Sequence, residues 1–170
     1  MNLNDYIRDI PDFPKEGIIF KDITPLLRDF SALDFACRQI HERFRESGVT
    51  VVAGIESRGF IFGTPIATLF SVGFVPIRKP GKLPYKSYSE EYTLEYGTDK
   101  IEMHIDALGD NDRVLIIDDL LATGGTAAAA RKLVEKAGGE VAGMGFIIEL
   151  EFLKGIDKLN GVPVHSLIKY

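Results

Sequence analysis

The chain has 170 residues, of which 45% are hydrophobic and 26% charged, so it can bury the core of one domain without disulfides. A formal net charge of −5 argues against a general nucleic-acid or membrane binder, whose surface field must be positive. The single cysteine, Cys37, excludes an internal disulfide framework and suits a reducing compartment.

Residues 1–12, at the start of the chain, lack the apolar core of a signal peptide. No apolar run further along approaches the length needed to span a bilayer, so we expect a cytoplasmic protein without membrane contact. Residues 1–30 show little regular periodicity, and we expect them to form a small N-terminal hood over a single domain that spans 1–170.

Apolar spacing then predicts helices that alternate with strands. Ser31 and Asp34 form a plausible capping pair for the first long helix, which ends before Gly48, and Gly138 and Gly139 close the last. The order predicts an α/β fold, with a mostly parallel twisted sheet and helices on both faces. The expected helices are 33–47, 60–70 and 126–137. The expected strands are 51–55, 73–77, 92–96, 100–104, 114–118, 141–148 and 162–168, and the pair 92–96 and 100–104 can form a hairpin.

The run 114–126 joins a buried strand to two carboxylates and a glycine-containing loop. Asp118 and Asp119 follow four apolar residues, at the strand end where parallel sheets bind ligands. The loop after them precedes an alanine-rich helix, so its N–H groups can converge on a phosphate. Carboxylates accept hydrogen bonds from hydroxyls, so a ribose phosphate fits this run better than a free phosphate. The loop consists of Ala122, Thr123, Gly124, Gly125 and Thr126.

The loop Glu56, Ser57, Arg58 follows the strand 51–55 and opens a helix, which suits anion binding by N–H groups and a guanidinium. A hydrolase nucleophile at Ser57 is excluded because Ile55 stands where the nucleophile elbow needs glycine. A surface turn with a solvated arginine is the alternative for this loop.

Residues 78–88 carry four cations and no acid, and their prolines and glycine predict an irregular loop. Lys79 and Lys82 belong to this basic segment, which can close over a reactive site and exclude water. Taken alone, the segment is better explained as a solvated basic loop. Its place after a strand end favours contact between Lys79 and a substrate anion.

The run 114–126 resembles the phosphoribosyl diphosphate signature of the type I phosphoribosyltransferases, and similarity to that family extends over residues 11–170. The resemblance implies Mg²⁺-assisted transfer of a 5-phosphoribosyl group from phosphoribosyl diphosphate to adenine, giving AMP and diphosphate. It also implies a homodimer. The segments that carry it are 11–25, 56–59, 78–84, 94–97, 114–126, 148–150 and 153–155.

The resemblance implies a role for each candidate residue. Asp118 and Asp119 would orient the ribose and stabilise its cationic form, and the 122–126 loop would bind the 5-phosphate. Arg58, Lys79 and Lys82 would neutralise the leaving diphosphate together with magnesium, which substrate and water mainly hold. Glu56 and Ser57 would belong to the diphosphate loop, whose candidate cis bond joins these two residues. Glu95 would handle the proton at the purine, although an ordinary exposed glutamate is an equal alternative.

In the hood, the resemblance implies that Phe20 stacks on adenine and that backbone groups of Ile19 and Lys21 read its edge. Core packing competes with this role for Phe20 and Ile19. A relative that uses an oxopurine would need a donor at that edge, and residues 147–150 offer no lysine. A purine-responsive regulator of the same fold is the other alternative, which the absence of room for a DNA-binding domain before Pro11 disfavours. The three histidines lack metal-ligand spacing.

Overall fold

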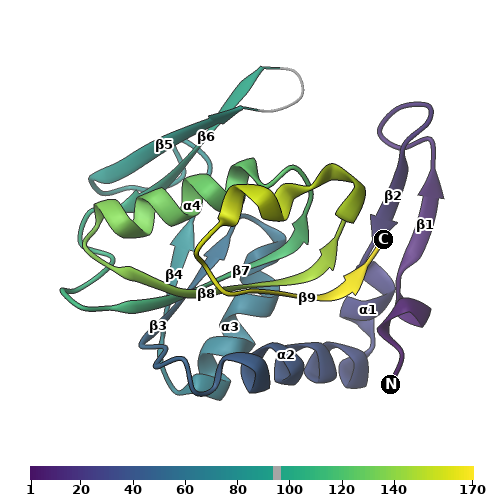
Figure 1. The fold of residues 1–170 in the computed structure, drawn as a ribbon, viewed down its shortest axis with the longest axis horizontal. Helices are drawn as coiled ribbons and strands as arrows, with labels where there is room; N and C mark the ends of the chain where they lie inside the picture. The colour runs from purple at the N-terminus through teal and green to yellow at the C-terminus, as the bar shows by residue number, and fades with distance from the viewer. Residues whose placement is uncertain (94–96) are drawn as a thin grey trace.

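The computed structural model describes residues 1–93 and 97–170. At its centre lies a parallel five-stranded sheet in the order β4-β3-β7-β8-β9, which confirms the expected α/β architecture. Figure 1 shows α4 on one face of this sheet and α2 and α3 on the other. The strands are β3 (Val51–Ile55), β4 (Gly73–Ile77), β7 (Arg113–Leu121), β8 (Glu140–Glu149) and β9 (Val164–Lys169).

Alternate residues of the sheet enter two hydrophobic clusters, one on each face. In β7, Val114 and Ile116 pack with α4, whereas Leu115 and Ile117 pack with α2 and α3. All four side chains are fully buried, as a central parallel strand requires. The apolar run before Asp118 therefore fixes both the centre of the sheet and the position of the residues that follow it.

The main helices are α2 (Phe30–Phe44), α3 (Arg58–Phe70) and α4 (Gly125–Lys136). The predicted capping pair of Ser31 and Asp34 is wrong, because Asp29 caps α2 and accepts a hydrogen bond from the Ala32 N–H at 2.9 Å. The Asp34 carboxylate instead pairs with Arg38 one turn later, at 2.7 Å. The first long helix therefore starts three residues earlier than predicted.

The strands β5 (Ser87–Thr93) and β6 (Thr98–His104) form the expected antiparallel hairpin. It is a sheet of its own and lies beside α4 (Figure 1). β5 begins five residues before the predicted strand, so residues 87 and 88 are extended rather than part of an irregular basic loop. Cross-strand pairing with β6 outweighs the loop character of the prolines before it.

The hood consists of the short helix η1 (Leu3–Tyr6), the antiparallel strands β1 (Arg8–Pro11) and β2 (Ile19–Asp22), and α1 (Thr24–Arg28). In Figure 1 it stands beside the end of β9, near the last residue. The Lys21 ammonium lies 3.7 Å from the centre of the Tyr170 ring, which joins the hood to the end of the sheet. Two further short helices, η2 (Glu151–Leu153) and η3 (Gly155–Leu159), precede β9.

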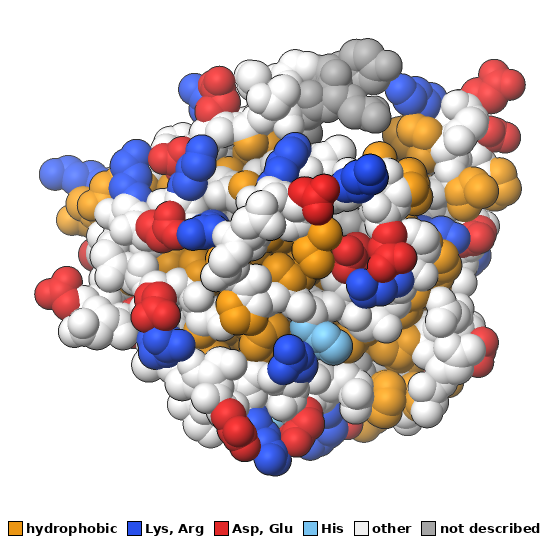
Figure 2. All heavy atoms as spheres, in the orientation of Figure 1, with side chains coloured by type: hydrophobic (Ala, Val, Ile, Leu, Met, Phe, Trp, Pro, Cys, Tyr) orange, Lys and Arg blue, Asp and Glu red, His pale blue; other side chains and the backbone are white. Residues whose placement is uncertain are grey.

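On the face of the molecule in Figure 2, acidic and basic side chains are interspersed, so that face presents no large area of one charge. Within residues 1–93 and 97–170, no helix has the length and apolar character that crossing a membrane requires.

Candidate active site

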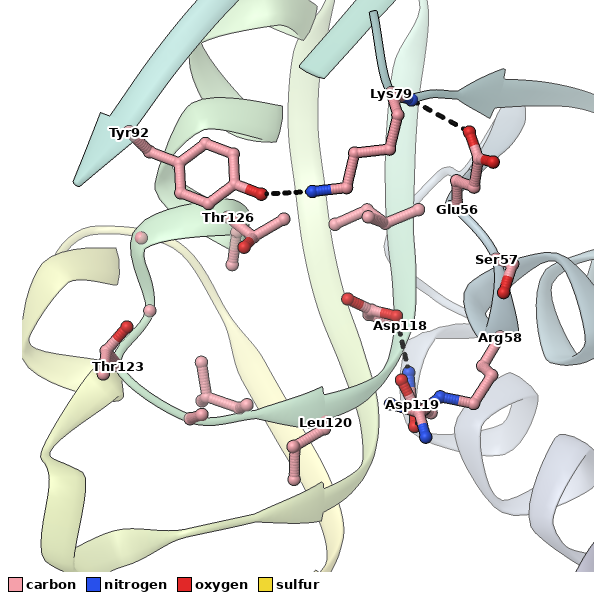
Figure 3. Close-up of a pocket in the computed structure, with 16 residues that line it drawn as sticks. Glu56, Ser57, Arg58, Lys79, Tyr92, Asp118, Asp119, Leu120, Thr123 and Thr126 are labelled. Atoms are coloured by element: carbon pink, nitrogen blue, oxygen red, sulfur yellow. Dashed lines mark hydrogen bonds and ion pairs between the residues drawn. The ribbon is translucent and has the colours of Figure 1, made fainter. Parts of the chain in front are cut away.

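A pocket of about 580 Å³ opens at the carboxyl ends of β3 and β7. In Figure 3 the 122–126 loop forms one side of it, Glu56, Ser57 and Arg58 form the other, and Asp118 lies between them. The pocket therefore brings together three segments that the sequence analysis had treated separately. Its lining residues are Ile55, Glu56, Ser57, Arg58, Lys79, Tyr92, Asp118, Asp119, Leu120, Leu121, Ala122, Thr123, Gly124, Gly125, Thr126 and Ala127.

The sequence analysis predicted that the two carboxylates lie at the end of their strand. This prediction is wrong, because β7 continues to Leu121 and stays paired with β8. Its pairing with β3, however, ends at Ile117. Beyond that residue β7 has lost one neighbouring strand, and the space beside it becomes the pocket. Asp118 and Asp119 therefore line an open edge of the sheet although they belong to a strand.

The electrostatics of the two carboxylates differ. Burial raises the pKa of Asp118 well above its usual range, and the adjacent charge of Asp119 raises it further, although the Asp119 N–H donates to Asp118 Oδ1 at 2.9 Å. Burial also raises the pKa of Asp119, and Arg58, whose Nε lies 2.8 Å from Asp119 Oδ2, opposes that rise. Asp118 is thus the carboxylate without a guanidinium partner of its own within bonding distance.

The loop after β3 holds Arg58 at the start of α3, as expected. The peptide bond between Glu56 and Ser57 is cis, which confirms the bond singled out in the sequence. Gly59 allows α3 to approach β7, because a Cβ there would lie 2.6 Å from the Ile117 carbonyl oxygen. The first residue of α3, Arg58, and the loop before it therefore line the pocket.

The 122–126 loop leads directly into α4, whose N-cap is Gly124 with a φ of 76°. This left-handed conformation favours glycine. A Cβ on Gly124 would lie 2.2 Å from the Gly155 carbonyl oxygen, and one on Gly155 would lie 2.1 Å from that of Ala122. The loop is therefore packed backbone to backbone against the start of η3, which fixes the direction of its N–H groups.

Lys79 is held at both ends. Its backbone N–H donates to Glu56 Oε2 at 2.9 Å, and its ammonium donates to the Tyr92 hydroxyl at 2.9 Å and to Asp99. Arg78 also pairs with Glu56, at 3.2 Å. Burial raises the pKa of Glu56, but the hydrogen bonds from Lys79 and Arg78 outweigh it and leave that pKa lowered. Glu56 thus anchors the basic segment to the diphosphate loop predicted from the sequence.

Of the predicted site residues, four do not line this pocket and a fifth lies outside the described residues. Lys82 contacts its own segment instead, where its carbonyl oxygen accepts from Arg78 Nη1 at 3.3 Å. Ile19, Phe20 and Lys21 are in the hood, where the Phe20 ring lies 5.5 Å from the Arg58 guanidinium. The hood therefore borders the same site. Glu95 lies outside the described residues.

The sequence reasoning missed Ile55, Tyr92, Leu120, Leu121 and Ala127, of which Tyr92 has a polar group. Tyr92 lies in β5, which no motif connects to the pocket. Its aromatic character and its place in a predicted hairpin were the only signals. Within residues 1–93 and 97–170, no group of three or more His, Cys, Asp or Glu side chains is arranged to hold a metal ion.

Comparison with known proteins places this geometry in a family. The chain matches the phosphoribosyl transferase domain over residues 22–157. It is 60% identical over 169 residues to the adenine phosphoribosyltransferase of Maridesulfovibrio salexigens, covering 99% of both chains. The crystal structure of the Thermoanaerobacter pseudethanolicus adenine phosphoribosyltransferase superposes with a TM-score of 0.96 at 51% identity, covering 99% of this chain and 98% of that one. The Saccharomyces cerevisiae enzyme complexed with an imino-altritol bisphosphate and adenine gives a TM-score of 0.91 at 41% identity, covering 97% and 96%.

Proposed function

The chain belongs to the adenine phosphoribosyltransferases, pentosyltransferases that make AMP and diphosphate from adenine and phosphoribosyl diphosphate, and we propose how its pocket performs this reaction. The observation that carries the proposal is the pocket between Asp118 and the 122–126 loop. It offers carboxylates for two ribose hydroxyls and a nest of N–H groups for a phosphate, side by side.

The 122–126 loop binds the 5-phosphate in this proposal. The first N–H groups of α4 have no partner within the helix, and the helix dipole favours negative charge at that end. Thr123 and Thr126 add hydroxyl donors on the same loop (Figure 3). Asp118 and Asp119 then meet the ribose hydroxyls, which keeps their charge away from the phosphate and next to the anomeric carbon.

Loss of diphosphate leaves positive charge on the ribose, and a buried carboxylate next to it stabilises that charge. This stabilisation grows as the bond breaks, so it lowers the barrier rather than merely tightening binding. Without substrate, burial and the charge of Asp119 raise the pKa of Asp118, and the charge of Arg58 offsets this only in part. We therefore assign Asp118 to the stabilisation of the cationic sugar and Asp119 to the positioning of Arg58 and a ribose hydroxyl.

The side of the pocket proposed to bind the diphosphate consists of Arg58, Lys79, Lys82, Glu56 and Ser57. Arg58 and Lys79 line the pocket and carry positive charge, and Glu56 holds the Lys79 backbone in place. Lys82 enters only if the basic segment changes conformation, because it lies outside the pocket lining.

Magnesium fits this donor set as a substrate-bound ion. Within the described residues no three-ligand cluster would cage it, and Mg²⁺ ordinarily binds through phosphate oxygens, water and one or two carboxylates. When bound, the ion neutralises charge on the leaving diphosphate. Asp118, Asp119 and Glu56 are the carboxylates in the pocket lining, and they would be available to the water shell of the ion.

The hood is proposed to bind adenine. The Phe20 ring lies 5.5 Å from the Arg58 guanidinium and is only partly buried, so it is accessible beside the pocket. A backbone carbonyl of Ile19 or Lys21 can accept from the exocyclic amine. The Lys21 side chain is occupied, because its ammonium pairs with Asp9 at 2.7 Å and covers Tyr170. This occupation supports the main-chain role over a side-chain role for Lys21.

We also propose a cytoplasmic homodimer, with residues 1–170 forming a single domain and 1–30 supplying the base-binding hood. The free and buried Cys37 suits a reducing compartment. The dimer follows from the family resemblance.

The decisive test is AMP formation from adenine and phosphoribosyl diphosphate with Mg²⁺, run beside hypoxanthine, guanine and xanthine and repeated with excess chelator. We expect metal-dependent turnover with adenine alone. Turnover of an oxopurine would contradict the account of the hood and leave the sugar site intact. Binding of the activated sugar without turnover of any base would favour a regulator instead.

For Glu95 we propose proton handling at the purine imidazole. Glu95→Gln removes the titratable proton while preserving shape, so kcat should fall far more than the affinity for phosphoribosyl diphosphate. Steady-state kinetics and equilibrium binding on the same preparation separate the two quantities. Equal losses in both would reject the proton-transfer role.

A further inference from the structure

Tyr92 is buried to 8% exposure in the hairpin, and its hydroxyl faces the pocket (Figure 3). The hydroxyl accepts a hydrogen bond from the Lys79 ammonium at 2.9 Å and donates one to Asp99 Oδ2 at 3.1 Å. Asp99 is the direct cross-strand partner of Tyr92, and its carboxylate also pairs with Lys79. We call Lys79, Tyr92 and Asp99 the lysine clamp.

The clamp leaves part of the ammonium available to a ligand. A lysine ammonium has three N–H donors, and Tyr92 and Asp99 occupy two of them. The third remains for an anion in the pocket that Lys79 lines. Although burial disfavours the charged form, the hydrogen bonds to Asp99 and Tyr92 outweigh it and raise the pKa of Lys79. The ammonium therefore stays charged beside the pocket.

The same tyrosine also touches the opposite wall of the site. A Cβ built on Gly125 would lie 3.4 Å from Tyr92 Cδ2 and 3.1 Å from the Thr93 carbonyl oxygen. The hairpin thus packs closely on the first residue of α4. The Tyr92 ring therefore lies close to Gly125 of the 122–126 loop, and its hydroxyl is bonded to Lys79.

We propose that Tyr92 and Asp99 are positioning residues that hold the Lys79 ammonium toward the diphosphate of the substrate at a fixed distance from the 5-phosphate loop. The inference rests on the proposed role of Lys79 in diphosphate binding. A free lysine side chain loses rotamer freedom when it binds an anion, and the clamp removes that loss in advance.

The hairpin supplies its own control pair. Glu91 and Lys100 are cross-strand partners one position along, and their charged atoms lie 3.5 Å apart. Adjacent residues of a strand point to opposite faces, so this pair points away from the face that carries the clamp. Glu91→Gln tests the effect of losing a hairpin ion pair without touching Lys79.

The experiment measures KM for phosphoribosyl diphosphate, KM for adenine and kcat in Lys79→Met and in Tyr92→Phe, Asp99→Asn and Glu91→Gln. Each of the last three is made alone and in combination with Lys79→Met. Tyr92→Phe keeps the ring on Gly125 and removes only the hydroxyl. We expect Tyr92→Phe and Asp99→Asn each to raise KM for phosphoribosyl diphosphate about three- to tenfold, with kcat and KM for adenine within about twofold. Neither should have a further effect beside Lys79→Met. Glu91→Gln should match the wild type.

Four outcomes would overturn the inference. An equal effect of Tyr92→Phe with and without Lys79 would show that the hydroxyl acts by another route. A lower KM in Asp99→Asn would make Asp99 a competitor of the substrate rather than a support for the lysine. If Lys79→Met changes KM for phosphoribosyl diphosphate and Tyr92→Phe does not, the positioning role of the clamp is rejected and the diphosphate role of Lys79 stands. If Lys79→Met leaves this KM unchanged, both roles are rejected. Should Asp99→Asn fold poorly, Tyr92→Phe decides alone.

Discussion

Asp118 combines a functional requirement with a cost in stability. Arg58 pairs with Asp119, so the charge of Asp118 is met within the pocket mainly by the N–H of its neighbour. Burial and the second carboxylate raise its pKa, which means that the unliganded fold opposes its ionisation. A carboxyl whose folded pKa is raised contributes stability below its unfolded pKa and loses it as the pH rises through its folded pKa.

Asp118→Asn should therefore make the unliganded protein more stable at neutral pH while it severely reduces AMP formation. Each ~1 kcal/mol gained appears as roughly 2–4 °C in Tm for a chain of this size. The gain should shrink as the pH falls toward the ordinary aspartate range, because the wild-type carboxyl is then neutral too. Thermal melts of both proteins from pH 4 to 8 test this.

Asp119→Asn is the matched control, because it removes a carboxylate that Arg58 already compensates. Its stability gain at neutral pH should be smaller than that of Asp118→Asn. A lower Tm for Asp118→Asn at pH 8 would contradict the view that the Asp118 charge strains the unliganded site.

Cys37 offers a probe of unfolding. It is 2% exposed on α2, and burial raises the pKa of its thiol to about 12. Since the thiolate is the reactive form, iodoacetamide at pH 8 should leave the folded protein unmodified and label one site per chain in denaturant. Mass spectrometry over a urea series should show labelling that follows the loss of circular dichroism. Rapid labelling in native buffer would mean that α2 opens locally.

At the scale of elements, η3 acts as a support for the 122–126 loop. The two segments meet through Gly155 and Gly124, where no Cβ fits on either side. Gly155→Ala should push the Ala122 carbonyl outward and misdirect the N–H groups of the loop, raising KM for phosphoribosyl diphosphate at least about tenfold. Steady-state kinetics with the activated sugar as the varied substrate measure the change.

Gly73→Ala is the control for that substitution. Gly73 begins β4, has an ordinary φ and leaves nothing within 4 Å of an added Cβ, so activity should not change. Wild-type kinetics in Gly155→Ala would show that the loop tolerates the displacement and that η3 does not support it.

Asp22, which is 7% exposed, ties the elements of the hood to one another. Its carboxylate accepts from Arg8 at 2.6 and 3.0 Å and from the Thr24 N–H and hydroxyl at 2.9 and 2.8 Å. Asp22→Ala should loosen the hood, raising KM for adenine several-fold with little change in KM for phosphoribosyl diphosphate. A stability loss of about 2 kcal/mol should accompany it.

The pH dependence of that loss has a definite sign. The Thr24 N–H, and after it Arg8, outweigh burial and lower the pKa of Asp22, so its contribution is full above the ordinary aspartate range and disappears as the pH falls through the lowered pKa. The gap in Tm between wild type and Asp22→Ala should close in acid. Asp34→Ala, which breaks an exposed pair with Arg38 on α2, serves as the control with unchanged KM values. Equal changes in both KM values for Asp22→Ala would mean that the hood does not act on the base alone.

Some elements were predictable because the signal was local. The strands 51–55 and 73–77 match residue for residue, since each is a short apolar run between turn residues. The start of α2 was not, because Asp29, Ser31 and Asp34 are all good caps and the packing of α1 selects the first. Sequence preference narrows such a choice without deciding it.

The site shows the same division. The carboxylates and the loop after them form one continuous motif, and all seven of those residues line the pocket. Tyr92 was missed because both of its contacts depend on the folded chain. Its pairing with Asp99 depends on the register of the hairpin, and its bond to Lys79 joins two separate segments. Both depend on tertiary structure, which a motif does not encode.

For the whole molecule, the parallel sheet explains how an acidic chain accommodates an anionic substrate. The strands β3 and β7 deliver their carboxyl ends, and the helices α3 and α4 their N-termini, to one edge. Two helix dipoles, Arg58 and Lys79 therefore act together there, although the chain as a whole has a net charge of −5. Chain order and parallel pairing, both readable from the sequence, place this edge.

The hood pairs with no strand of the central sheet among the described residues, since β1 and β2 form a sheet of their own. Side-chain contacts connect the strands of the hood with the central sheet, for example between Lys21 and Tyr170. With the hood in its proposed base-binding role, substitutions in β1 and β2 can therefore change the base preference while the sugar-binding half of the site stays constant. A directed-evolution library confined to β1, β2 and their connection is the place to select enzymes for adenine analogues.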